Sequence, residues 1–117
     1  MREPGTGHAR LESLGAGRFR ISGVLDASTA REMLEESDAR FAQFKDLDVD
    51  LGGVGESDSA GLALLIEWLR VARQQQKQIR FANVPAQIEA LARISEVEDL
   101  IGGEKEKKEH KEEKKSG

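Results

Sequence analysis

The stretch Asp58-Ser59-Ala60-Gly61-Leu62 stands where an alternating residue pattern gives way to a helical one. Residues 47–51 alternate apolar and acidic side chains, which predicts a half-buried strand. After the stretch, apolar residues recur at helical spacing, at Leu62, Leu65, Ile66 and Leu69. The five residues therefore predict a strand-to-helix junction, where backbone N–H groups lack partners and negative charge is favoured.

The segment before this junction predicts a hairpin and a helix. Residues 9–12 and 18–22 alternate in polarity around the turn signal at 15–17, which indicates two short antiparallel strands. Thr29 followed by Glu32 fits a capping box at the start of a helix. The apolar face of that helix has one polar break, Ser37, among Ala30, Met33, Leu34, Phe41 and Phe44.

The segment after the junction predicts a helix to about residue 76, a strand near 79–82 and a third helix. Pro85 suits the first turn of that third helix, whose inward face is Ile88, Leu91 and Ala92, and Leu100 and Ile101 end the domain. Every strand has one apolar and one polar face, which favours helices on only one side of the sheet. We expect an α/β (α+β-like) domain of order β-β-α-β-α-β-α, with a mixed open sheet of about four to five strands.

Length and composition indicate one domain and exclude several functions. A chain of 117 residues suits a single domain, here 8–103, after a flexible leader 1–7. Residues 104–117 hold lysine and glutamate without an apolar side chain, which predicts a disordered, solvated tail. No cysteine is present, and His8 and His110 lie near the termini, so we expect neither a metal nor a cofactor. A net charge of -4 without a basic patch argues against nucleic acid, and the lack of a long apolar run or signal peptide predicts a cytoplasmic protein.

Catalysis is not expected at the junction. Glu56 and Asp58 accompany the serines, but no histidine or lysine stands near them in the sequence to activate a nucleophile. The glycine-rich residues 52–55 lack the lysine and hydroxyl residue that complete a nucleotide-binding loop.

The long helix carries a second apolar stripe, Leu64, Trp68 and Val71, with Ala60 beside it. Either this stripe contacts a flanking helix of the same domain, or it is exposed and binds a partner, as tryptophan often does at interfaces. The second interpretation predicts that Trp68 is at least partly exposed to solvent.

Ser59 has three possible roles at the junction: a helix cap, a partner contact or a phosphate acceptor. Ser57 is a second candidate acceptor by position, and Gly61 removes bulk beside Ser59, which would let a partner approach the backbone. The predicted partner-binding residues are Ser57, Asp58, Ser59, Ala60, Gly61, Leu64, Trp68 and Val71.

With Asp-Ser-x-Gly-Leu at 58–62 in this order of elements, the chain resembles the STAS domain over about residues 8–101. Gly23-x-Leu25-Asp26 is similar to the family's turn into the first helix. In one branch, the anti-sigma factor antagonists, a kinase partner phosphorylates the serine after the aspartate. The resemblance then implies that a serine-kinase anti-sigma factor phosphorylates Ser59, although Ala60 stands where those proteins often carry a second serine.

A second branch is the small cytoplasmic STAS subunit of the Mla-type phospholipid-transport ABC complex, which serves outer-membrane lipid asymmetry. Residues 61–69 and the segment from Asn83 to Ser95 are similar to that branch. The resemblance implies a non-catalytic subunit that binds the ATPase, and through it the permease, at the inner face of the cytoplasmic membrane. In that branch the hydroxyl residue of the motif, here Ser59, lies in or near the contact with the ATPase.

Overall fold

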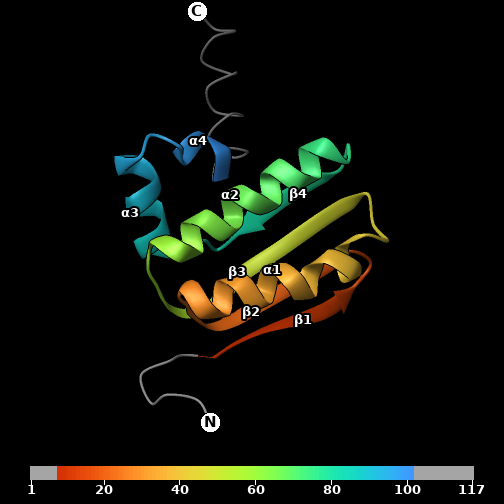
Figure 1. The fold of residues 1–117 in the computed structure, drawn as a ribbon, viewed down its shortest axis with the longest axis horizontal. Helices are drawn as coiled ribbons and strands as arrows, with labels where there is room; N and C mark the ends of the chain where they lie inside the picture. The colour runs from red at the N-terminus through yellow and green to blue at the C-terminus, as the bar shows by residue number, and fades with distance from the viewer. Residues whose placement is uncertain (1–7, 102–117) are drawn as a thin grey trace, which may run out of the picture.

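The computed structural model describes residues 8–101 as a four-stranded sheet with helices packed on one face (Figure 1). The elements in chain order are β1 (Ala9–Gly15), β2 (Arg18–Leu25), α1 (Ala27–Phe41), β3 (Asp46–Ser57), α2 (Ser59–Gln74), β4 (Gln78–Ala82), α3 (Ala86–Ile94) and α4 (Glu98–Ile101). The predicted fold class and element order are confirmed. The predicted leader 1–7 and tail 104–117 lie outside the described residues, so these boundaries stay predictions.

The strand order is β1-β2-β3-β4, and the sheet is mixed as expected. β1 and β2 pair antiparallel as a hairpin, whereas β2 with β3 and β3 with β4 pair parallel through the connections made by α1 and α2. The three parallel strands therefore end at one edge of the sheet. The start of α1 and the start of α2 follow directly from β2 and β3 at that edge.

The core lies between the sheet and the helices. Alternate residues of β3 point into it, so Leu47, Val49 and Leu51 are buried while Asp48 and Asp50 face away. β3 extends past the predicted strand 47–51 and includes the glycine-rich residues 52–55. These glycines are thus part of the sheet.

Asp26, rather than Thr29, is the N-cap of α1. The Asp26 side chain accepts a hydrogen bond from the Thr29 amide at 3.0 Å, and the Thr29 hydroxyl accepts one from the Asp26 amide at 2.8 Å. The predicted capping box of Thr29 with Glu32 is therefore wrong. Aspartate is as good a cap as serine or threonine, and here Asp26 is the cap and Thr29 is the third residue of the box.

The face of the sheet that the helices leave uncovered carries charged side chains, among them Asp50. Asn83 Nδ2 and the Gly52 amide donate to Asp50 Oδ1 at 2.9 and 2.8 Å. The Asn83 hydrogen bond, then the Gly52 amide and the positive charge of Arg20, lower the pKa of the Asp50 carboxyl despite some desolvation. A lowered pKa in the folded state stabilises the fold above the unfolded pKa, and this contribution is lost as the pH falls through the folded value.

Asn83→Gly should raise the pKa of Asp50 towards its ordinary value. Asn83 has a φ of 54°, which glycine adopts without strain, so the change removes the donor and keeps the backbone. The lost contribution should be about 0.5 kcal/mol or less at neutral pH, because the carboxylate is mostly solvated, and it should vanish in acid. A carboxyl NMR titration measures the pKa, and urea unfolding at neutral and acidic pH measures the stability. An unchanged pKa would contradict the assigned cause.

Candidate functional site

The junction between β3 and α2 is capped by Asp58. Asp58 Oδ1 accepts a hydrogen bond from the Ala60 amide at 2.8 Å. The Asp58 amide donates to the Leu25 carbonyl at 3.2 Å, which ties the corner to the end of β2. The junction predicted from the sequence is therefore present, and Asp58 performs the capping that was open between Asp58 and Ser59.

Ser59 is the first residue of α2 and is exposed. The structure gives its hydroxyl no hydrogen bond to any residue within 8–101. Ser57, half-buried beside it, donates from its hydroxyl to the Asp58 carbonyl at 3.1 Å. Asp58 is the cap, so the predicted capping role of Ser59 is wrong, while a partner contact and a phosphate acceptor stay predictions. We call Ser57, Asp58, Ser59 and Ala60 the Ser59 corner.

Gly61 is buried, which contradicts the expectation that it opens the backbone to a partner. A Cβ atom at this position would collide with the Ser57 hydroxyl and lie 3.1 Å from Ile88 Cδ1 and 3.4 Å from Leu25 Cβ. Gly61 therefore allows α2 to pack closely against α3 and the end of β2. The requirement for glycine comes from the interior of the domain.

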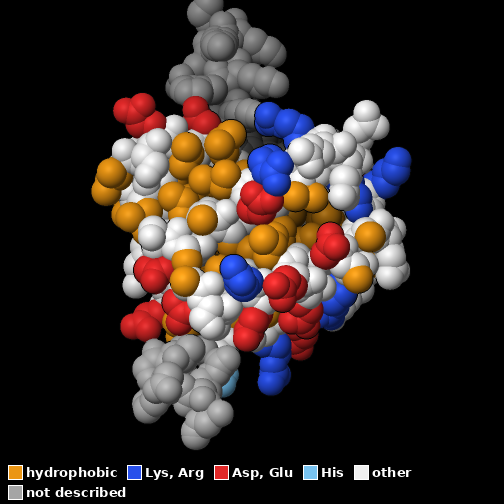
Figure 2. Space-filling view, viewed as in Figure 1, with side chains coloured by type: hydrophobic (Ala, Val, Ile, Leu, Met, Phe, Trp, Pro, Cys, Tyr) orange, Lys and Arg blue, Asp and Glu red, His pale blue; other side chains and the backbone are white. Residues whose placement is uncertain are grey.

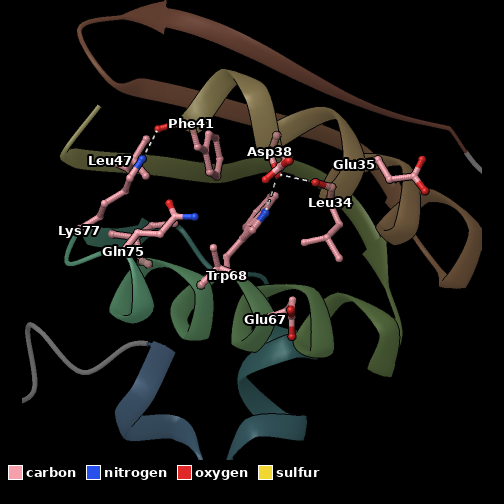
Figure 3. Close-up of a pocket in the computed structure, with 13 residues that line it drawn as sticks. Leu34, Glu35, Asp38, Phe41, Leu47, Glu67, Trp68, Gln75 and Lys77 are labelled. Atoms are coloured by element: carbon pink, nitrogen blue, oxygen red, sulfur yellow. Dashed lines mark hydrogen bonds between the residues drawn. The ribbon is translucent and has the colours of Figure 1, made fainter. Parts of the chain in front are cut away.

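The prediction that Trp68 is exposed is wrong. Trp68 is only 3% exposed, Leu64 is equally buried, and Val71 is half-buried. Trp68 Nε1 donates a hydrogen bond to Ser37 Oγ on α1 at 2.8 Å, as drawn in Figure 3. Trp68, the central residue of the second stripe, thus packs against α1, so its contact lies within the domain.

A cleft remains between α1 and α2 near this packing, with a volume of about 400 Å³. Figure 3 shows Trp68 and Phe41 at its centre, Glu35 and Asp38 on the α1 side, and Lys77 at one end. This cleft was not predicted. It joins side chains from α1, β3, α2 and β4, and no local pattern in the sequence marks such a place.

Exposed apolar side chains also occur on the short C-terminal helices. Ile94 of α3 is 77% exposed and Leu100 of α4 is 46% exposed. Figure 2 shows hydrophobic side chains gathered over the α3 and α4 side of the helical face. Ile101 beside Leu100 is buried, and Ile88 and Ala92 are buried as predicted, but Leu91 is only half-buried.

Within residues 8–101, no group of three or more histidine, aspartate or glutamate side chains is placed to hold a metal ion. None of the helices there is long and apolar enough to cross a bilayer. The recorded hydrogen bonds in this part of the chain join Ser59 to neither a histidine nor a lysine. The Ser59 corner thus presents an exposed hydroxyl without a hydrogen bond to the described residues.

Residues 9–102 match the family model described as "Mlab, STAS domain". Two structures of the anti-sigma factor antagonist SpoIIAA are similar to the chain. The unphosphorylated form has 14% identity and a TM-score of 0.63, covering 80% of this chain and 84% of that one. The phosphorylated form, from Bacillus, has 17% identity and a TM-score of 0.61, covering 87% and 97%.

An anti-sigma factor antagonist from Mycobacterium paratuberculosis is also similar, with 18% identity and a TM-score of 0.57, covering 86% of this chain and 87% of that one. A comparison with curated protein sequences finds no significant match. At these identities, the solved structures support the fold alone, while the family match covers almost all of the described residues.

Proposed function

Because the chain belongs to the STAS-domain family described by the MlaB model, we propose that it is a non-catalytic subunit of an Mla-type ABC transporter for phospholipids. In this role it binds the ATPase subunit on the cytoplasmic side of the membrane, and through the ATPase it associates with the permease. The family match over residues 9–102 is the observation that carries the proposal. STAS domains act through protein contacts, so the function requires a docking surface rather than a catalytic centre.

The Ser59 corner supplies that docking surface in our proposal. Asp58 and Ser59 are exposed, and Asp58 holds the start of α2 at a fixed position relative to β2. The Ser59 hydroxyl is available to a partner because the side chain of Asp58, rather than that of Ser59, caps α2. Leu64 and Trp68 contribute indirectly, since they belong to the core that holds α2 in place, and Gly61 contributes by close packing.

Ser59→Arg should lower the affinity for the purified ATPase subunit at least tenfold, because a long charged side chain would stand in the centre of the contact. Ser59→Ala should lower it less than about threefold, since only one solvent-competed hydrogen bond is removed. Calorimetric titration of the full chain with a purified Mla-type ATPase subunit from the same organism measures both.

Ser28→Arg is the matched control for this titration. Ser28 is also an exposed serine in the first turn of a helix, but on α1. The Ser28→Arg variant should retain most of the affinity of the unmodified chain for the ATPase subunit. If Ser59→Arg binds the ATPase as tightly as the unmodified chain, the Ser59 corner is not the contact. If the unmodified chain does not bind any ABC ATPase, the proposed function is wrong.

A second function is supported by the likeness to SpoIIAA, which has been solved in phosphorylated and unphosphorylated forms. Here the chain would be an anti-sigma factor antagonist, and its exposed Ser59 would accept a phosphate from a serine-kinase anti-sigma factor. The start of a helix favours the added negative charge. Incubation with that kinase and ATP should add one phosphate by intact mass, and Ser59→Ala should abolish it. An unchanged mass with an active kinase would reject this function.

A further inference from the structure

The cleft between α1 and α2 is separate from the Ser59 corner. Both helices start at the sheet edge where the parallel strands end, and the cleft lies along their middle and C-terminal parts. Trp68, at its centre, follows Ser59 by about 13 Å along the axis of α2. A ligand in the cleft therefore contacts residues that the proposed ATPase contact does not use.

The interior of the cleft is apolar. Half-buried Leu34, Val71 and Ile79 present side chains to it above the buried rings of Phe41 and Trp68. These residues come from α1, α2 and β4, so the floor is formed by the packed core itself. A ligand that covers these apolar side chains and removes them from water gains favourable binding free energy.

The free charge around the cleft is negative. Glu35 and Asp38 are exposed on α1, and no ion pair is recorded for either within residues 8–101. Glu67 on α2 is paired with Arg70, which lowers the pKa of the Glu67 carboxyl. The one lysine of the lining, Lys77, donates to the Phe41 carbonyl at 2.8 Å at the C-terminal end of α1 and keeps its positive charge, so Glu35 and Asp38 together still leave the lining net negative.

The dimensions of the cleft suit a short helical segment. Its α1 side runs from Leu34 to Phe41, about 10 Å, and its α2 side from Glu67 to Gln75, about 12 Å. Two turns of an α-helix are about 11 Å long. Amphipathic helices bind such grooves by inserting side chains spaced at i, i+3 or i+4, and i+7.

We propose that this cleft binds a basic amphipathic helix of a partner protein. Its apolar residues enter the space above Phe41 and Trp68, and its lysine or arginine residues face Glu35 and Asp38 on α1. An acidic helix or an anionic lipid would meet the same carboxylates with repulsion. This binding surface is additional to the Ser59 corner and does not depend on the identity of the partner that binds there.

The test uses the full chain and a synthetic helix of about fourteen leucine and lysine residues, long enough to form when bound. Trp68 is the only tryptophan, so its fluorescence reports binding next to the cleft. The peptide should change that fluorescence and bind measurably by calorimetry. The same composition with its leucines out of helical register, and a version with glutamate in place of lysine, should each bind at least tenfold more weakly.

Two charge-neutralising pairs separate a specific site from general attraction to an acidic protein. Glu35→Gln with Asp38→Asn should weaken binding of the peptide about fivefold. The matched pair Glu89→Gln with Asp99→Asn makes the same chemical changes at exposed positions on α3 and α4, and should weaken binding less than twofold. Equal losses from both pairs would overturn the proposal.

A blocked cleft gives an independent readout. Val71→Lys places a charge where the helix inserts, and it should reduce binding more than tenfold while far-UV circular dichroism remains unchanged. Ser59→Arg should not change peptide binding, so a failed ATPase titration and a failed peptide titration lead to different conclusions. No binding of the basic peptide, or tighter binding of the acidic one, would overturn the proposal. Self-association detected by sedimentation, and abolished by Val71→Lys, would instead identify a second copy as the occupant and also overturn it.

Discussion

Trp68→Ala should lower the free energy of unfolding by about 3–5 kcal/mol. A loss of this size is a large part of the stability of a small domain, typically about 5–15 kcal/mol. Removal of the indole enlarges the cleft between α1 and α2 and removes the contacts of the ring with the core. Because the variant lacks the only tryptophan, urea unfolding must be followed by far-UV circular dichroism.

The size of this effect follows from the contacts of the ring. The Trp68 ring lies 5.2 Å from that of Phe41 and 6.4 Å from that of Phe81, and the Phe41 ring is 4.9 Å from that of Phe19. This aromatic cluster connects α2 to α1, β2 and β4. Its members bury a large apolar area and gain a further contribution from ring geometry.

Ser37→Ala tests the polar part of the same contact. The Ser37 hydroxyl accepts from Trp68 Nε1 at 2.8 Å and donates to the Leu34 carbonyl at 2.9 Å. Its removal leaves a buried indole N–H without a partner and should cost about 1–3 kcal/mol. In a Trp68→Phe background the Ser37→Ala change should cost less, because the indole N–H is gone, so the effects of the two substitutions should not add.

For Trp68→Ala, a loss of unfolding free energy below about 1 kcal/mol would contradict the burial of the indole and favour an exposed docking residue.

The error about Trp68 has a geometric origin. At about 100° per residue, Trp68 and Leu64 lie roughly 60° and 100° from Leu65 around α2. They are therefore on the flank of the helix, on the side that a neighbouring helix contacts, rather than on its outer pole. The sequence pattern showed that these apolar residues share one side of the helix, but it did not show that a neighbouring element covers Trp68. That neighbour, α1, precedes α2 by a whole strand in the chain.

The order of elements was predictable because each element carries its own periodicity. The alternation in β3 and the 3.6-residue period in α2 are both local properties of the chain. The N-cap of α1 was harder to predict, because Asp26 and Thr29 are both good capping residues. Only contacts made in the folded domain select between them. The Thr29 hydroxyl also lies 2.8 Å from the Val24 carbonyl, to which it donates, and this contact was not visible in the sequence.

The two candidate sites also differ in how well the sequence predicts them. The Ser59 corner consists of four consecutive residues, so a motif could identify it. The cleft is formed by α1, α2 and two strands, and its character depends on which carboxylates are left without an ion pair after folding. Glu67 is paired with Arg70, three residues later on the same helix, whereas Glu35 has Asp38 at that spacing and forms no ion pair in the described part of the chain.

Gly23→Ala should lower the free energy of unfolding by about 2–4 kcal/mol, which corresponds to a fall in Tm of roughly 10–25 °C. Gly23 has a φ of 103°, a conformation that an L-residue adopts only with strain. A Cβ atom there would also collide with the His8 carbonyl oxygen and lie 3.0 Å from Ala9 Cα. Backbone atoms cannot rotate away as a side chain could, so the start of β1 would have to move.

Gly55→Ala is the matched control, because Gly55 also lies in a strand next to an irregularity in the pairing of β2 with β3. Its φ is not positive, and a Cβ atom there would meet no atom within 4 Å. That substitution should be neutral or stabilising by up to about 1 kcal/mol, since alanine restricts the unfolded chain. Thermal unfolding of both variants compares the same chemical change at two places. If the two variants melt at the same temperature, the close approach of His8 to Gly23 does not constrain the fold. If only Gly23→Ala melts early, the glycine is required by the close contact between β1 and β2.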